Sequence, residues 1–205
     1  MLPGYSRGVD GVIEELRPGL KRWVAVHPEW KPEEDELDES YRPVASVLHQ
    51  APDALVLIDP VVPDDLWPSL DAEVKACGTA VIVLTTISFH ARSRDEVARR
   101  YSAKLGGEPD GVSAFSAGRG DEVALWLEEP GAVVFGDAIL GDQRGGLILS
   151  PWSPNVEARE VTRRALLPLL DLPVELVLPS HGEPILGHGR EALARVLADT
   201  GGAGR

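Results

Sequence analysis

The sequence has little cysteine and no long apolar run. Cys77 is the only cysteine among the 205 residues, so the chain can form no intrachain disulfide and no cysteine-rich zinc site. No apolar stretch approaches the roughly 18 residues that a membrane-spanning helix needs. The N-terminus also lacks the basic and apolar regions of a signal peptide. We therefore expect a cytoplasmic protein that does not enter a membrane.

Clusters of positive charge are missing as well. The chain has 20 Lys and Arg residues against 33 Asp and Glu residues, which gives a net charge of -13. Such a charge repels phosphate backbones, and this argues against a nucleic-acid partner. A G-x-S-x-G motif is also absent, so the sequence gives serine catalysis little support. We expect a small-molecule substrate or ligand.

The patterning predicts an α/β protein with one domain, residues 1–205. Hydrophobic residues make up 43% of the chain, which suits a globular core. Residues 29–43 are expected to form an acidic loop and residues 200–205 a frayed tail. Strands are predicted at 9–16, 22–27, 44–50, 55–58, 80–85, 112–115, 122–127, 132–135 and 174–178. Helices are predicted at 63–76, 94–105, 155–170 and 190–198. The alternation of strands with helices favours a layered arrangement.

Three polar residues follow predicted strands. His90 comes after the strand at 80–85, Asp137 after Gly136, and His181 after the strand that ends in Pro179 and Ser180. One carboxylate and two imidazoles are an ordinary ligand set for a divalent transition metal. The same three side chains could instead form a metal-free, hydrogen-bonded cluster that joins the strand ends. In either case we expect them to meet at one edge of the fold.

In this order, the three strand ends resemble the metallo-β-lactamase fold superfamily. The resemblance extends to Leu55–Pro60, which looks like that family's early strand ending in an aspartate, here Asp59. It implies an αββα sandwich, in which two mixed sheets are flanked by helices. In the resembling family the residue at the position of Asp59 supports neighbouring loops, and we expect the same structural role here.

The central motif of that family, H-x-H-x-D-H, is eroded in this chain. The motif stands directly before a helix, so the start of the helix sets the register. Ser93 and Glu96 have the spacing of a capping box, which predicts that the helix begins at Arg94. Counted back from there, the four ligand positions of the motif fall on Ser88, His90, Arg92 and Ser93.

Only His90 keeps the residue type of the motif. Arg92 stands where the family has a metal-binding aspartate, and a guanidinium cannot bind a cation because it only donates hydrogen bonds and stays charged. We therefore expect Arg92 to pair with Asp137, and we do not expect a dinuclear zinc centre. The resemblance leaves His90, Asp137 and His181 as ligands for at most one weakly held zinc, iron or manganese ion.

Two functions are compatible with such a degenerate centre. In the first, the protein is a divergent hydrolase of a small ester, thioester or lactone-like substrate. His90 and His181 would position water, directly or through one metal, while Asp137 accepts a proton and Arg92 stabilises the oxyanion. In the second, it is a non-catalytic module that binds a small anion through Arg92 and the histidines.

Three further residues are candidates for the walls of a substrate cavity. Trp152 lies in a loop bounded by Pro151 and Pro154, shortly after Asp137. His27 and Trp30 follow the predicted strand at 22–27. A loop aromatic can form the side of a binding site, although the sequence favours a packing role for His27 and for Trp152.

Overall fold

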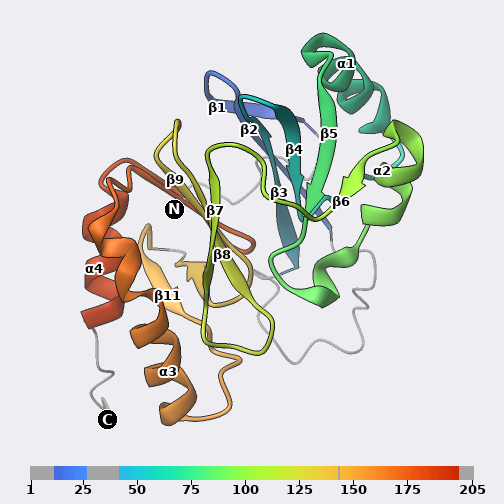
Figure 1. Cartoon of the computed structure of the whole chain (residues 1–205). Coiled ribbons are helices and arrows are strands. Elements are labelled where there is room, and N and C mark those ends of the chain that lie inside the picture. The colour runs from blue at the N-terminus through green and yellow to red at the C-terminus, as the bar shows by residue number, and fades with distance from the viewer. Residues whose placement is uncertain (1–11, 27–41, 143, 199–205) are drawn as a thin grey trace, which may run out of the picture.

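The computed structural model describes residues 12–26, 42–142 and 144–198. Two β-sheets face each other, and helices cover the outer face of each sheet (Figure 1). The αββα sandwich predicted from the sequence is therefore confirmed. Nearly all of the expected acidic loop and the whole expected tail lie outside the described residues.

The first sheet is built by the N-terminal half of the chain, in the order β1-β2-β3-β4-β5-β6. Its strands are β1 (Glu14–Arg17), β2 (Leu20–Val26), β3 (Pro43–Gln50), β4 (Ala54–Ile58), β5 (Ala80–Leu84) and β6 (Lys104–Leu105). The pairs β1–β2, β2–β3 and β3–β4 are antiparallel, whereas β4–β5 and β5–β6 are parallel. Parallel neighbours need a crossover connection, which α1 (Trp67–Cys77) and α2 (Arg94–Tyr101) supply here.

The second sheet has the order β13-β12-β9-β8-β7. Its strands are β7 (Val112–Ser116), β8 (Val123–Leu127), β9 (Ala132–Phe135), β12 (Leu176–Pro179) and β13 (Ile185–Leu186). Only β9 and β12 are parallel. Between them the chain forms a hairpin, β10 (Ile139–Gly141) and β11 (Leu147–Leu149), then α3 (Val156–Leu166) and the 3-10 helix η4 (Leu167–Asp171). Last comes α4 (Gly189–Ala198), which lies beside α3 at the left of Figure 1.

Strand β4 shows how alternation divides the apolar residues between layers. Val56 and Ile58 point into the core between the two sheets. Leu55 and Leu57 belong to the outer core with Trp67 of α1. Successive side chains of a strand point to opposite faces, so a strand buried on both faces must be apolar at every position. All five residues of β4 are buried.

Two predicted helices end earlier than their sequence pattern indicates. The helix predicted at 94–105 ends at Tyr101, because Ser102 adopts the left-handed conformation and Lys104–Leu105 pair with β5. The helix predicted at 155–170 becomes 3-10 after Leu166, because Pro168 has no amide hydrogen to continue the α-helical bonding. No helix in the described ranges is long and apolar enough to cross a membrane.

The β10–β11 hairpin and β13 were not predicted from the sequence. The end of β10 makes a close backbone contact with the loop after β12. The Gly141 amide donates to the His181 carbonyl at 2.9 Å. Gly182 follows at φ 81°, and a Cβ atom there would collide with the Gly141 carbonyl oxygen. Only glycine fits a left-handed position with backbone this near. This contact fixes the loop that carries His181.

We expect Gly182→Ala to lower the free energy of unfolding by about 3 kcal/mol, because left-handed strain and a backbone clash add together. Gly145→Ala is the matched control. Gly145 has a similar φ of 82°, but nothing lies within 4 Å of an added Cβ, so the strain alone should cost about 1 kcal/mol. Urea unfolding of both variants measures the difference, and equal losses would contradict the close-contact explanation.

Candidate active site

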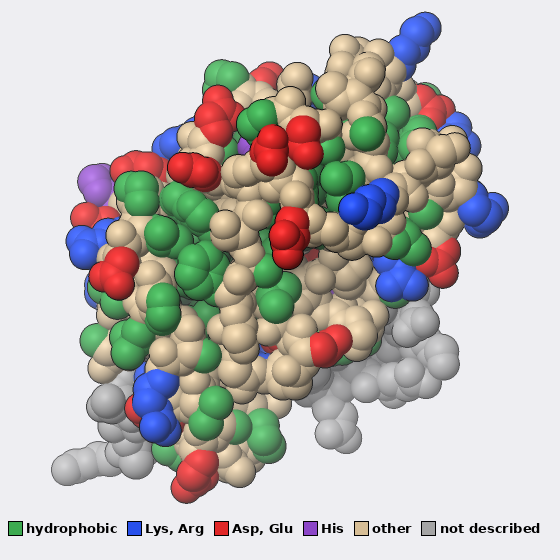
Figure 2. Space-filling view, in the orientation of Figure 1, with side chains coloured by type: hydrophobic (Ala, Val, Ile, Leu, Met, Phe, Trp, Pro, Cys, Tyr) green, Lys and Arg blue, Asp and Glu red, His purple; other side chains and the backbone are tan. Residues whose placement is uncertain are grey.

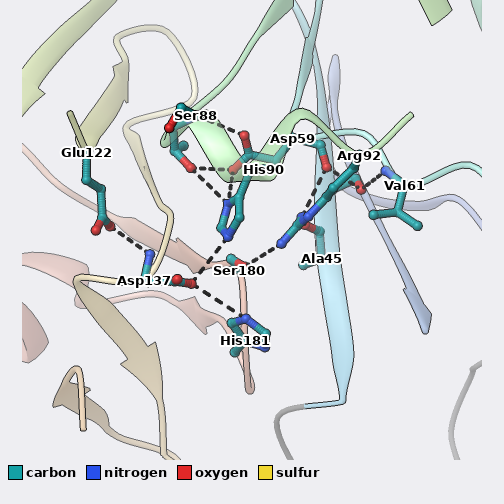
Figure 3. Close-up of polar contacts among 12 residues, drawn as sticks. Ala45, Asp59, Val61, Ser88, His90, Arg92, Glu122, Asp137, Ser180 and His181 are labelled. Carbon is teal, nitrogen blue, oxygen red and sulfur yellow. Dashed lines mark hydrogen bonds and ion pairs between the residues drawn. The ribbon is translucent and has the colours of Figure 1, made fainter. Parts of the chain in front are cut away.

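His90, Asp137 and His181 lie together between the two sheets, as predicted (Figure 3). Nε2 of His90 is 3.4 Å from Oδ1 of Asp137, and Nε2 of His181 is 3.6 Å from the same oxygen. Parallel pairing of β9 with β12 aligns Phe135 with Pro179, so the loops after these strands leave the sheet side by side. All three side chains are buried.

His90 does not lie at the end of a strand. It belongs to η3, a single 3-10 turn at Ser88–Ala91 between β5 and α2. Its Nδ1 is 3.0 Å from Oδ2 of Asp59, while Phe89 contacts the ring edge-on at 4.8 Å between centroids. The imidazole is thus oriented from one side by Asp59 and faces Asp137 on the other.

Asp59 holds this turn in place with its whole carboxylate. Oδ1 accepts the Thr86 amide at 2.8 Å, and Oδ2 accepts the Thr86 hydroxyl in addition to its contact with His90. The expected supporting role of Asp59 is confirmed. The structure adds that Asp59 also acts on a site residue, because it fixes the orientation of the His90 ring. A strand-terminal aspartate was the only sequence signal for this.

Glu122 supports Asp137 in the same way, and sequence reasoning missed it. Its Oε1 accepts the amides of Asp137 at 2.7 Å and Ala138 at 2.6 Å, and Oε2 is 3.2 Å from Arg119. Burial raises the pKa of Glu122, and the neighbouring Asp137 adds to the rise, while the two amides and Arg119 oppose it. A buried acid directly before β8 had no distinctive pattern along the chain.

The two central groups shift each other's pKa. Burial favours neutral His90, but the contacts with Asp137 and Asp59 outweigh it and raise its pKa above 6.5. Burial alone would raise the pKa of Asp137, whereas the contact with His90 and the positive charges of His90, His181 and Arg119 lower it. Opposite charges favour each other's ionised forms. The cluster therefore stabilises an imidazolium beside a carboxylate.

The expected ion pair between Arg92 and Asp137 is wrong. Nη1 of Arg92 donates to the carbonyls of Asp59 at 3.2 Å and Ala45 at 3.4 Å, and Nη2 donates to the Ser180 hydroxyl at 3.3 Å. Burial lowers the pKa of Arg92, while Asp59 and Asp137 oppose the change. Its backbone has φ 43°, and the side chain crosses to the loop of the other sheet. Asp137 instead faces the two histidines.

The predicted helix start at Arg94 is confirmed, but the capping box is not. Ser93 is the N-cap residue, yet its side chain makes no cap hydrogen bond. Its hydroxyl accepts the Val62 amide at 3.0 Å instead. The Ser93 side chain therefore joins the loop after β4 to the start of α2.

The three cavity-wall candidates have different outcomes. Trp152 lies edge-on to His181, with ring centroids 5.3 Å apart and an interplanar angle of 71°. It is only half-buried, so an aromatic surface stands next to the outermost histidine. His27 and Trp30 lie outside the described residues. Their role as substrate contacts stays a prediction, as does that of Trp152.

The cluster contains the donor atoms of a metal site, but not the arrangement. Oδ1 of Asp137 is buried, and both imidazole nitrogens near it are too distant for good hydrogen bonds. Such an oxygen could accept a cation. However, among residues 12–26, 42–142 and 144–198, no three His, Cys, Asp or Glu side chains are placed so that they could hold an ion. As placed, these side chains do not fit a three-ligand metal centre.

Comparison with known proteins finds no match by sequence and clear matches by structure. No family model matches the chain, and no curated protein matches it. The crystal structure of VMB-1 at pH 5.5 aligns with a TM-score of 0.61 at 12% identity, covering 92% of this chain and 95% of that chain.

Two metallo-β-lactamases align almost as well. FIM-1 from Pseudomonas aeruginosa, in its mono-zinc form, gives a TM-score of 0.57 at 15% identity and covers 91% of this chain and 94% of its own. The metallo-β-lactamase from Erythrobacter litoralis gives a TM-score of 0.56 at 15% identity. The alignment covers 92% of this chain and 91% of that chain. At such identities the likeness concerns architecture, and fold does not imply function. The chain has the metallo-β-lactamase fold.

Proposed function

We propose that the chain is a divergent hydrolase of a small ester, thioester or lactone-like substrate. The observation that supports this is the alternation of carboxylate and imidazole along Asp59, His90, Asp137 and His181. Side-chain exposure is 3% at Asp59, 2% at His90, 7% at Asp137 and 11% at His181, so His181 is the outermost group of the series. Positioned acid and base groups of this kind catalyse proton transfer to and from reacting atoms.

In the proposed reaction His181 is the general base. Its imidazole takes a proton from a water molecule, whose oxygen adds to the carbonyl carbon of the substrate. The carboxylate of Asp137 stabilises the imidazolium that forms, as the acid of a catalytic triad does. When the carbon–oxygen or carbon–sulfur bond breaks, the leaving group takes the proton back from His181.

Arg92 has no direct part in this reaction. The sequence suggests it as the oxyanion donor, but its Nη1 and Nη2 groups donate to two backbone carbonyls and a hydroxyl in the structure. The same contacts weaken the alternative of a non-catalytic module that binds small anions through Arg92. In the proposal Arg92 is a positioning residue that ties the Ser180–His181 loop to Ala45 and Asp59.

We further propose that the substrate is a small molecule and that the chain acts in the cytoplasm. The net charge of -13 supports the first statement, because a nucleic-acid backbone would be repelled. Trp152 stands beside His181 and would form an apolar wall next to the reacting carbonyl group. The second statement rests on the single cysteine of the chain, which suits a reducing compartment.

The first prediction concerns Asp137→Asn. We expect hydrolysis to fall at least a hundredfold, because an amide cannot stabilise the imidazolium of His181 by charge. Asp95→Asn is the control, since Asp95 is an exposed acid on α2 and its replacement should leave activity unchanged. Initial rates on a panel of esters, thioesters and lactones measure both. Brisk turnover by Asp137→Asn would place the chemistry elsewhere.

The second prediction concerns metal. We propose that the centre is degenerate and binds at most one divalent zinc, iron or manganese ion, weakly, because the donors of the cluster do not surround a common point. FIM-1, which shares the fold, is described in a mono-zinc form. Calorimetric titration with each metal should give a stoichiometry of one or less and low affinity. Two tightly bound zinc ions per chain would refute a degenerate centre.

The third prediction concerns pH. The pKa of His90 is raised above 6.5 in the folded protein, so the folded state holds a proton that the unfolded state loses. The stability contributed by His90 is then complete below pH 6.5 and is lost as the pH rises through the folded pKa. Thermal unfolding from pH 6 upward should show this decline, and His90→Asn should remove it.

His188→Asn provides the matched control for that experiment. His188 is exposed and has φ 57°, a conformation that asparagine tolerates. The pH dependence of its melting temperature should follow that of the unmodified chain. The same decline in His90→Asn as in the unmodified protein would show that His90 is not the titrating group.

A further inference from the structure

A cavity on the other side of the second sheet is unrelated to the histidine cluster. It has a volume of about 580 Å³ and lies between the β10–β11 hairpin, α3 and α4. None of the residues that line it belongs to the proposed active site. Volumes of roughly 300–1,000 Å³ are typical of small-molecule sites. The cavity is therefore large enough for an organic ligand.

Much of the wall is apolar. Leu147, Leu149 and Ile185 line it and are partly buried against the outer core of the second sheet. Val196 of α4 also lines it and is 7% exposed. These side chains come from a hairpin, an edge strand and a helix that pack on one another, so the hydrocarbon surface is held by the fold. Such a surface favours an apolar ligand body.

The charged residues of the wall are all basic. Arg159 and Arg163 come from α3 and Arg195 from α4, and no Asp or Glu is among the described residues that line the cavity. This departs from the composition of the chain, in which acids outnumber bases 33 to 20. Figure 2 shows acidic side chains spread over the face turned to the viewer. A site lined by arginines in such a protein favours an anion.

The three arginines differ in the partners of their guanidinium groups. Nη1 of Arg163 is 3.7 Å from Oε2 of Glu160. Nε of Arg195 donates to the Glu191 carbonyl at 3.3 Å, and the structure gives its guanidinium no carboxylate partner within the described ranges. The side chain of Arg159 makes no hydrogen bond or ion pair with any residue the structure describes. Two guanidinium groups from different helices can therefore bind a ligand without giving up an ion pair.

We propose that this cavity is a binding site for an amphipathic carboxylate, with the hydrocarbon part on the Leu147–Leu149 wall and the carboxylate between Arg159 and Arg195. A carboxylate matches the guanidinium group in charge and in hydrogen-bond geometry. The apolar body supplies the binding energy that an exposed ion pair alone does not give. This site is independent of the proposed hydrolase activity.

The experiment uses decanoate as the probe, at concentrations below micelle formation, with binding followed by calorimetry on the full chain. Acetate carries the charge without the tail, and decanol carries the tail without the charge. We expect saturable binding of decanoate with one site per chain, and at least tenfold weaker binding of acetate and of decanol. Equal binding of decanol and decanoate would overturn the proposal, as would the absence of decanoate binding.

A pair of double variants locates the site. Arg159→Gln with Arg195→Gln should weaken decanoate binding at least tenfold. Lys75→Gln with Arg99→Gln removes the same charge from exposed positions on α1 and α2, in the opposite helical layer, and should leave the affinity unchanged. Equal losses in both would reduce the effect to overall charge and overturn the proposal. If the first double variant does not fold, the comparison of decanoate, acetate and decanol on the unmodified chain still tests the proposal.

Discussion

The buried carboxylate of Asp137 is the interaction on which the rest of the site depends. It is the common neighbour of His90 and His181, which come from opposite sheets of the sandwich. A buried charge is costly unless it is paired and hydrogen-bonded. Here the charges of the histidines and Arg119 offset that cost and keep the pKa of Asp137 low. The ionised carboxylate of Asp137 therefore lies where loops from the two sheets come together.

Three neighbouring side chains fix the geometry around Asp137. Glu122 fixes the backbone after β9 through two short hydrogen bonds, and Asp59 fixes the ring of His90. Arg92 ties the loop of His181 to the first sheet. All of these contacts are made by side chains to neighbouring loops. These contacts hold the loops of the two sheets together around Asp137.

Much of the fold was predictable because it depends on local patterns. Alternating and continuous apolar runs gave most of the strands, and β9 was predicted with its observed bounds. Asn155 caps α3 where the sequence places its start. The errors fall where distant pairing overrides a local pattern. Lys104–Leu105 continue a helical pattern but pair with β5, and β13 exists only because β12 lies beside it.

The sequence by itself determined the acidic character of the chain and its layered fold, because these follow from composition and periodicity. The convergence of His90, Asp137 and His181 was expected from the resemblance of three motifs to those of a known family. Only the tertiary structure decided which charges meet. It placed Arg92 on backbone carbonyls and left Asp137 to the histidines. The partner of a charged group depends on side-chain directions and burial across the two sheets, and spacing along the chain does not encode these.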